Sequence, residues 1–315
     1  MKRASWLAGL LLLLAAYISL VSIPRQALVV ERIPVATSPT DVGLAFEAFR
    51  ITAEGESLPL AGWWMPAQDA GATLVFIHGG GSNRHNTFFG SLKFYRAIVD
   101  AGINVAAIDL RNHGDSGADG IGLQFGRTES ADAMAAIRWA RERAPDLPLF
   151  AMGISMGGAT IIHAAHRGAQ VDGLVLLDAL LDTRDTFKQG GWIETGLPAG
   201  LFAPSAWSAT TFFGLPTGDE QSLDRAAALA LPMLVIQDPD DPVTRARFSR
   251  ELAQRNPRVT YWMAPPIDPD HPDLAWKGRW GSHVSAFLFF PVETVAQIRA
   301  FIAATSRQGK AAWTR

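Results

Sequence analysis

The stretch that most constrains this chain is Gly153-Ile154-Ser155-Met156-Gly157, which joins an apolar run over 149–152 to an alanine-rich helical pattern over 159–168. This order predicts a strand, a sharp turn and a helix. Glycines two residues before and after Ser155 carry no side chain, so the strand and the helix can approach closely. Such a turn exposes the serine hydroxyl and leaves the Met156 amide at a helix N-terminus, where unpaired N–H groups favour negative charge. The stretch therefore predicts a nucleophile beside one donor of an oxyanion hole.

Composition and charge limit what else the chain can be. With 315 residues, of which 48% are hydrophobic and 18% charged, it can bury the core of one large α/β domain or two small ones. The formal net charge is -2 and the basic residues are scattered, which argues against a nucleic-acid partner. The absence of cysteine excludes disulfides, thiolate metal sites and a cysteine nucleophile, and it leaves serine as the obvious nucleophile.

The N-terminus carries an uncharged apolar run over 4–23, preceded by Lys2 and Arg3. About 20 helical residues reach about 30 Å, the thickness of the hydrocarbon core of a bilayer. The run ends at Ile23-Pro24, which is a poor cleavage site for a signal peptidase. Residues 1–23 are therefore predicted to be a membrane anchor, with the rest of the chain outside the cytoplasm, on the periplasmic or extracellular side. A cleaved signal peptide, which would make the protein secreted, and a buried soluble helix are the alternatives.

The remaining chain divides into a linker over 24–42 and a domain over 43–315. An antiparallel hairpin is predicted over 44–52 and 58–65, with a turn at 54–57. Strands are predicted over 72–77, 104–108, 149–154, 171–177, 232–236 and 259–263, of which 72–77 and 104–108 are expected to be buried. Helices are predicted over 88–101, 128–144, 159–168, 245–255 and 292–305. Strands alternating with helices in this way predict an α/β fold, in which a mostly parallel central sheet has helices on both faces.

A stretch over about 180–230 breaks this alternation and is too long for an ordinary connection, so it predicts a small cap over the site. Its apolar side chains would either line the underside of the cap and favour acyl substrates, or pack the cap against the body. They are Trp192, Leu197, Pro198, Leu201, Phe202, Trp207, Phe212 and Phe213.

A glycine cluster follows the predicted strand 72–77 in the order His78-Gly79-Gly80-Gly81. Glycines at the end of a central strand let backbone amides approach a bound group, and Gly80 is the candidate for the second oxyanion donor. A plain strand-to-helix loop and a phosphate-binding loop are the alternatives, although a phosphate loop would end in Gly-Lys-Ser/Thr.

Two other polar groups could suggest metal binding. Asp109, Arg111 and His113 follow the strand 104–108 and could be metal ligands or acid–base groups, but a buried hydrogen-bonded network is the favoured interpretation because buried charges must be paired. His163 and His166 are three residues apart on a predicted helix, but no acidic third ligand accompanies them, so ordinary helix positions are favoured. No metal and no cofactor are expected.

The chain combines the glycine loop, the loop 109–117, the Ser155 turn and the order Ser155, Asp241, His283. In these features it resembles the α/β-hydrolase fold family, in its serine esterase and acyl-hydrolase branch. The resemblance covers about 260 residues, from the hairpin to the last helix. It implies that His283 is the base and Asp241 the acid, with Met156 and Gly80 as oxyanion donors. Asp240, Asp238 and Asp178 are alternative acids, and His271, which lies in a loop between prolines, is an alternative base.

Two features depart from the family. The loop before its acid usually opens with His-Gly, whereas this chain has Gln237-Asp238. Three consecutive glycines are similar to those of hormone-sensitive-lipase relatives, but these usually carry an acidic residue before the nucleophile, where this chain has Ile154. That subfamily is therefore disfavoured.

The resemblance implies a serine hydrolase that cleaves carboxylic esters, including lipid or acyl esters, through an acyl-enzyme intermediate. An amidase or peptidase of the same fold and a non-catalytic binding module are the alternatives, because the fold does not settle the substrate. A dehalogenase would need a carboxylate in place of Ser155. The expected partners are a small-molecule or lipid-like ester and, through residues 1–23, a membrane. The acyl and alcohol groups, the oligomeric state and the cleavage of the anchor are left open.

Overall fold

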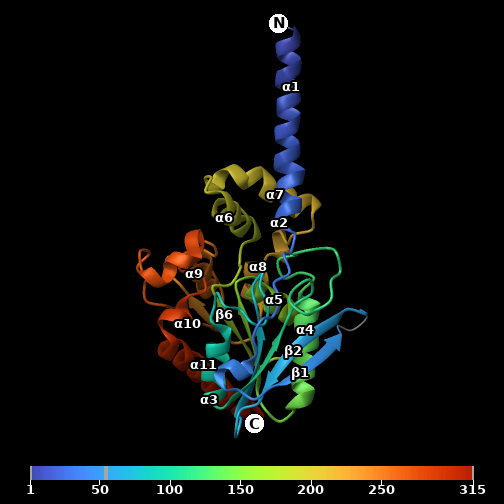
Figure 1. The fold of residues 1–315 in the computed structure, drawn as a ribbon. Coiled ribbons are helices and arrows are strands. Elements are labelled where there is room, and N and C mark those ends of the chain that lie inside the picture. The colour runs from blue at the N-terminus through green and yellow to red at the C-terminus, as the bar shows by residue number, and fades with distance from the viewer. Residues whose placement is uncertain (1, 53–55, 314–315) are drawn as a thin grey trace.

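The computed structural model of the protein describes residues 2–52 and 56–313. Its centre is an eight-stranded sheet from which one long helix projects (Figure 1). The strands are β1 (Glu47–Thr52), β2 (Pro59–Met65), β3 (Ala72–Ile77), β4 (Ile103–Ile108), β5 (Leu149–Ile154), β6 (Gly173–Leu177), β7 (Met233–Gln237) and β8 (Val259–Met263). The turn predicted over 54–57 falls partly on residues 53–55, which lie outside the described residues.

The strand order is β1-β2-β4-β3-β5-β6-β7-β8. β2 pairs antiparallel with β1 and with β4, and all the other neighbours pair parallel. The predicted α/β fold, with a mostly parallel sheet and an antiparallel N-terminal hairpin, is confirmed. Because β3, β5, β6, β7 and β8 run parallel, the loops that follow them meet at one edge of the sheet.

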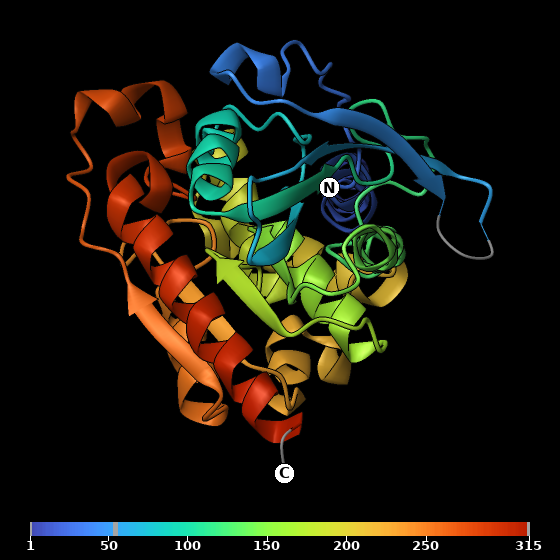
Figure 2. The same ribbon diagram turned by 90° about the horizontal axis from the view of Figure 1, so that it is seen from below.

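Helices cover both faces of the sheet (Figure 2). The α-helices are α1 (Lys2–Tyr17), α2 (Ile23–Ala27), α3 (Ser91–Asp100), α4 (Ser130–Arg143), α5 (Met156–His166), α6 (Thr183–Thr195), α7 (Ala203–Phe212), α8 (Ser222–Ala228), α9 (Ala246–Arg255), α10 (Ala286–Phe289) and α11 (Pro291–Trp313). A π-helix, η1 (Ile18–Ser22), joins α1 to α2. Short 3₁₀ helices are η2 (Pro39–Val42), η3 (Ala199–Phe202), η4 (Gly218–Glu220) and η5 (Pro272–Trp280).

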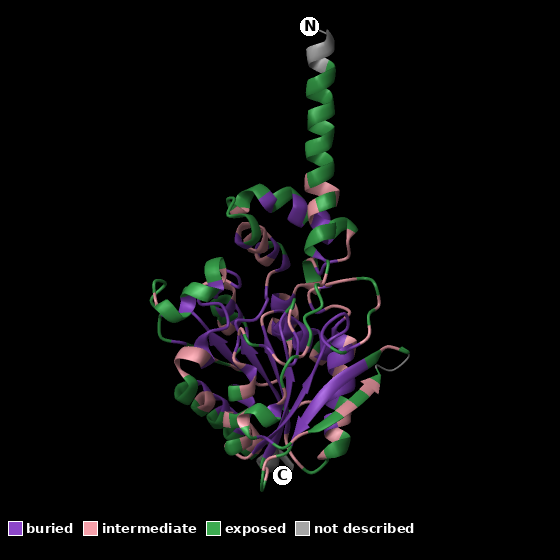
Figure 3. Ribbon diagram, in the orientation of Figure 1, coloured by how far each residue is buried: buried purple, intermediate pink, exposed green. Residues whose placement is uncertain are grey.

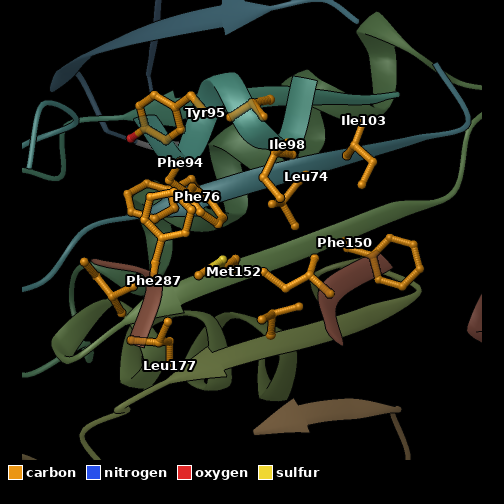
Figure 4. Packing of buried hydrophobic residues seen from close by; sticks show 14 of the residues in the cluster. Leu74, Phe76, Phe94, Tyr95, Ile98, Ile103, Phe150, Met152, Leu177 and Phe287 are labelled. Atoms are coloured by element: carbon orange, nitrogen blue, oxygen red, sulfur yellow. The ribbon is translucent and has the colours of Figure 1, made fainter. Parts of the chain in front are cut away.

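The inner strands β2 to β7 are buried on both sides, which is why they appear in the sequence as apolar runs, whereas the edge strands β1 and β8 are partly exposed (Figure 3). In β3, Leu74 and Phe76 face one hydrophobic core, whereas Val75 and Ile77 face the other. The first core is completed by α3, α10 and α11, and the second by α4, α5, α8 and α9. Figure 4 shows Phe76 of the first core beside residues of α3 and α10.

The predicted helix over 88–101 begins later than its apolar spacing suggested. Asn86 accepts hydrogen bonds from the amides of Phe89 through its side chain (2.9 Å) and of Gly90 through its carbonyl (3.0 Å), and so it forms a turn before α3. Gly90 has a φ of 76°, which a helix interior does not allow. The predicted helix over 292–305 is instead longer than expected, because α11 reaches Trp313.

The N-terminal helical run extends past the predicted anchor over 1–23. It continues through α2 to Ala27, and its part Trp6–Ala27 is the one helix among the described residues that is long and apolar enough to cross a membrane. The predicted linker over 24–42 lies against the body, because the carbonyls of Leu28 and Ile33 accept hydrogen bonds from Leu123 (2.9 Å) and Asn83 (2.9 Å). The division into anchor, linker and domain stays a prediction.

The stretch predicted as a cap lies between β6 and β7 and forms α6, η3, α7, η4 and α8. In Figure 1, α6 and α7 lie at the end of the body from which α1 projects. Since this stretch leaves β6 at its carboxyl end, it starts at the same edge of the sheet as the turn after β5.

Candidate active site

Ser155 occupies the turn between β5 and α5 with φ 51° and ψ -121°, a strained conformation for a residue with a side chain. The flanking glycines are required because a side chain at either position would collide with the backbone. A Cβ on Gly153 would lie 2.2 Å from the carbonyl oxygen of Gly157, and a Cβ on Gly157 would lie 2.2 Å from that of Ile77. The motif therefore folds as predicted for a physical reason, since no side chain fits at either position.

His283 connects Ser155 to Asp241. Its Nε2 lies 3.0 Å from Ser155 Oγ, and its Nδ1 lies 2.7 Å from Asp241 Oδ2. Ser155 is half-buried, whereas His283 and Asp241 are buried. The structure therefore brings together three predicted residues that are separated by 86 and 42 positions in the sequence.

The carboxylate of Asp241 is held in one orientation. Its Oδ1 accepts hydrogen bonds from the amides of Val243 (2.7 Å) and Thr244 (2.9 Å), and its Oδ2 accepts one from Thr244 Oγ1 (2.7 Å) in addition to the one from His283. These hydrogen bonds fix the side-chain conformation of Asp241 and aim its Oδ2 at the imidazole.

The alternative acids occupy other positions. Asp240 is exposed, and its amide donates to Asp238 Oδ1 (2.8 Å). Burial raises the pKa of Asp238 to about 6. Asp178 is buried, which raises its pKa well above the ordinary range, and its two oxygens accept the amides of Asp238 (2.8 Å) and Val284 (2.9 Å). Asp178 therefore ties the loop after β7 to the loop that carries the imidazole.

The alternative base, His271, is partly exposed and does not join this group. Its Nδ1 accepts the amide of Asp273 at 3.1 Å in the first turn of η5.

Asp178, Asp241 and His283 are also the one cluster among the described residues whose ligand atoms could surround a metal ion, since these atoms lie within 4.8 Å of one another. Both oxygens of Asp178 accept backbone amides, and both ring nitrogens of His283 have partners. A cation would have to displace these hydrogen bonds, so the arrangement fits a hydrogen-bonded site better than a metal site.

The glycine loop after β3 lies against the Ser155 turn. A Cβ on Gly79 would lie 3.2 Å from Ser155 Cβ, and one on Gly80 would lie 3.4 Å from Met156 Sδ. Met156 is the first residue of α5, so its amide has no acceptor within the helix. Gly79 therefore lies beside Ser155, and Gly80 lies beside the side chain of Met156, the residue that follows the serine.

Two buried histidines fix that loop. His78 lies 2.7 Å from the Gly79 carbonyl through Nδ1, and its Nε2 accepts the amide of Leu110 (3.0 Å). The Gly81 amide donates to His113 Nε2 (3.2 Å). Burial lowers the pKa of His78 to about 4 and that of His113 to about 3, so both are neutral and can accept these bonds near neutral pH.

The network interpretation of the loop 109–117 is confirmed. Asp109 pairs with Arg84 and accepts its amide (2.7 Å), and Arg111 makes a bidentate pair with Asp132, with its Nη2 at 2.6 Å. On the helix that follows Ser155, His163 is buried 3.3 Å from Ser222 Oγ, whereas His166 is exposed, so these two histidines do not converge.

Sequence reasoning missed Lys277, which is buried under the site. Its Nζ donates to the His283 carbonyl (3.0 Å) and to Ser285 Oγ (2.6 Å), and it lies 4.0 Å from the centre of the Phe88 ring. Burial lowers the pKa of Lys277 to about 7 despite the nearby carboxylates. A single lysine in an irregular loop has no periodic or spacing signal that could have indicated this position.

Comparison with known proteins supports the same architecture. Residues 68–207 match the family described as serine aminopeptidase, S33. An esterase of Pyrococcus furiosus, Pf2001, superposes with a TM-score of 0.70 at 21% identity, covering 88% of this chain and 97% of that one. The chain has the α/β-hydrolase fold. A second member of this fold family, an esterase from Exiguobacterium antarcticum, superposes with a TM-score of 0.55 at 15% identity, over 81% and 98% of the two chains.

Curated relatives of this α/β hydrolase include the lysophosphatidylserine lipase ABHD12 of Macaca fascicularis and of Rattus norvegicus. Each is 22% identical over 209 residues, which is 60% of this chain and 50% of the relative. The chain thus spans about half the length of the curated relatives it matches. Its similarities are to α/β hydrolases of the esterase and lipase type.

Proposed function

We propose that this α/β hydrolase is a serine hydrolase that cleaves carboxylic esters through an acyl-enzyme. The observation that carries the proposal is the hydrogen-bonded series Ser155 Oγ, His283 Nε2, His283 Nδ1 and Asp241 Oδ2, with separations of 3.0 and 2.7 Å. A serine is weakly nucleophilic unless a base removes its proton, and an imidazole oriented by a carboxylate is such a base.

In the proposed reaction His283 takes the Ser155 proton as Oγ attacks the ester carbonyl. Asp241 keeps the proton of His283 on Nδ1 and stabilises the imidazolium that forms. The amides of Gly80 and Met156 donate to the oxyanion, and one donor of this kind contributes about 3 kcal/mol to the barrier. His283 then protonates the leaving alcohol, and it activates the water that releases the acid and restores Ser155.

We propose a lipid-like ester as the substrate class and a membrane anchor as the role of the N-terminal helix. The apolar helix Trp6–Ala27 and the similarity to a lysophospholipid lipase support this class. The anchor stays uncut in this proposal, because Ser19 and Leu20 form hydrogen bonds with the cap, which cleavage near residue 23 would remove. The positive flank of the helix then leaves the domain outside the cytoplasm.

An amidase or peptidase is the second candidate, because the family that matches residues 68–207 is described as a serine aminopeptidase. A panel of nitrophenyl esters and aminoacyl amides, assayed side by side, separates the two candidates. Higher kcat/KM on the esters supports the proposal, and higher kcat/KM on the amides supports the alternative.

Fluorophosphonate labelling tests the nucleophile, since the probe reacts with activated serines. We expect the full chain to be labelled, Ser155→Ala to be unlabelled and inactive, and Ser306→Ala to behave as wild type, because Ser306 Oγ only donates to the Ile302 carbonyl on α11. Ester hydrolysis at the wild-type rate by Ser155→Ala would exclude the proposal. Absence of labelling in the wild type would favour a binding module.

A further inference from the structure

Two uncharged stretches that are far apart in the sequence lie side by side in the fold. Residues 4–24 and residues 195–218 contain no Asp, Glu, Lys, Arg or His. The first forms most of the N-terminal helical run, and the second forms η3 and α7 of the cap. Figure 1 shows α7 beside the base of that helical run.

Direct contacts fix α7 to the helical run. Ser19 Oγ lies 3.3 Å from Ser205 Oγ, and Ser208 Oγ donates to the Leu20 carbonyl at 2.5 Å. Below these bonds, Leu28 joins a hydrophobic cluster with Phe187 of α6, Ala206 and Ala209 of α7, and Leu215. The cap and the end of the helical run therefore form one packed unit.

The position of these contacts sets the depth of the cap. The candidate span Trp6–Ala27 has 22 residues, and about 20 residues are needed to cross the hydrocarbon core. Ser19 and Leu20 lie inside that span, seven to eight residues or about 11 Å from its Ala27 end. A helix bonded to them therefore lies on the Ala27 side of the bilayer, near the depth of about 5–10 Å at which interfacial helices bury their apolar face.

The same part of the cap exposes large apolar side chains. The exposed fractions are 52% for Leu197, 61% for Leu201, 46% for Trp207 and 67% for Phe212. The sequence predicted that these four side chains would line the underside of the cap or pack it against the body. They are exposed to solvent instead, whereas Phe202 of the same predicted set is buried. Figure 3 shows exposed segments in the cap beside the projecting helix. We call these four residues the apolar cap face.

We infer that the apolar cap face lies in the interfacial layer of the bilayer that the N-terminal helix spans, and that a lipid ester reaches Ser155 from that leaflet. The bilayer is the occupant because the face has no charge and is continuous with the membrane helix. Trp and other aromatic side chains are favoured at this depth. The position of the face rests on the membrane-anchor role proposed for the helix, and the route of the ester rests in addition on the proposed ester hydrolysis.

The fold leads from this face toward the site. The cap begins after β6, the neighbour of β5, at whose end Ser155 lies. An open depression of about 380 Å³ lies between α6, the start of η3 and the loop after Asp241, and it is lined by Gln189, Trp192, Pro198, Ala199, Pro242 and Arg245. Pro198 and Ala199 directly follow Leu197 of the apolar cap face. A lipid chain that enters there would pass from the face to the side of the site that carries the acid.

Depth can be measured because the chain has no cysteine. Leu201→Cys and Phe212→Cys, each in the full chain, are labelled with an environment-sensitive nitrobenzoxadiazole dye in phosphatidylcholine–phosphatidylglycerol vesicles. Lys93→Cys, at an exposed position on α3, is the matched control. We expect blue-shifted emission and quenching by nitroxide-labelled lipid at 201 and 212, and iodide quenching without lipid quenching at 93.

Two outcomes overturn the inference. Iodide quenching at 201 and 212 equal to that at 93 would show that the cap stands in water. Protection from both iodide and nitroxide lipid would show that protein covers the face, as in a contact between two copies of this chain. Quenching by lipid alone supports the inference, and this readout does not depend on activity.

The route is tested with Leu201→Ser/Phe212→Ser, which removes two exposed apolar side chains. We expect hydrolysis of an ester lipid in vesicles to fall by about tenfold, while fluorophosphonate labelling in detergent keeps its wild-type rate. Lys93→Ser should change neither. An unchanged vesicle rate in the double variant refutes the route. No labelling of the wild type refutes the proposed function instead, and leaves the dye result to decide the position of the cap.

Discussion

Replacing Asp241 by asparagine tests the proposed role of the carboxylate, because the structure dictates how the amide would sit. The amides of Val243 and Thr244 both donate to Oδ1, so the asparagine carbonyl must take that position. Its NH₂ group then replaces Oδ2 and faces Nδ1 of His283, 2.7 Å away. Since two donors cannot share this contact, Nδ1 becomes the acceptor and the ring proton moves to Nε2.

The imidazole then cannot accept the Ser155 proton. We expect kcat for nitrophenyl butyrate to fall by about 10⁴-fold, or about 5 kcal/mol of transition-state stabilisation, at pH 7. Stability should change by about 1 kcal/mol or less, because two of the bonds to residue 241 persist and Thr244 Oγ1 also lies 2.9 Å from the Asp178 carbonyl. The assay pairs kcat with the thermal midpoint.

Asp240→Asn is the matched control, since the neighbouring side chain is exposed, and it should keep kcat within about twofold of wild type. The reasoning fails if Asp241→Asn keeps more than a tenth of the wild-type kcat, or if both variants lose activity equally. A large drop in the thermal midpoint of Asp241→Asn would also contradict it, because the loss would then reflect unfolding.

Two further predictions concern stability. Gly157→Ala should destabilise the fold by about 3 kcal/mol, because its Cβ would lie 2.2 Å from the Ile77 carbonyl oxygen. Gly190→Ala on α6 is the control and should not destabilise it, because a Cβ there meets no atom within 4 Å. Thermal midpoints measured in detergent check both variants. The second prediction compares the free energy of unfolding of wild type with that of His113→Gln. As the pH is lowered below about 6.5, the wild type should lose about 1.4 kcal/mol per pH unit relative to the variant, because His113 takes up a proton in the unfolded chain but not in the folded one until its pKa of about 3 is reached. Urea titrations between about pH 7 and 4.5 check this, and a constant difference between the two proteins would contradict it.

Much of the fold could be predicted because its signals are local. The glycines around Ser155 are dictated by contacts within and beside one turn, and the buried strands appear as apolar runs. The convergence of Ser155, Asp241 and His283 followed from parallel strands, whose carboxyl ends share one edge.

What could not be predicted depends on contacts between distant segments. The resemblance favoured Asp241 over the adjacent Asp240, but what holds the Asp241 carboxylate in place, the amides of Val243 and Thr244, is visible only in the folded turn. The burial of Lys277 beneath the site has no sequence signal. The outward exposure of Trp207 was equally hidden, because an apolar residue in a cap reads the same whether it faces the site or the solvent.

The joint between the helical run and the cap has a consequence for shortening the chain. A version that starts after Ala27 would lose the partners of Ser205 and Ser208 and would also lose Ile23, which packs against the cluster that contains Ala206 and Ala209 of α7. Such a version would expose apolar surface of the cap to solvent and should self-associate. A version that starts at Ile18 would keep the contacts of Ser19 and Leu20 with the cap and would remove only the exposed helix α1, so it is the better starting point for crystals.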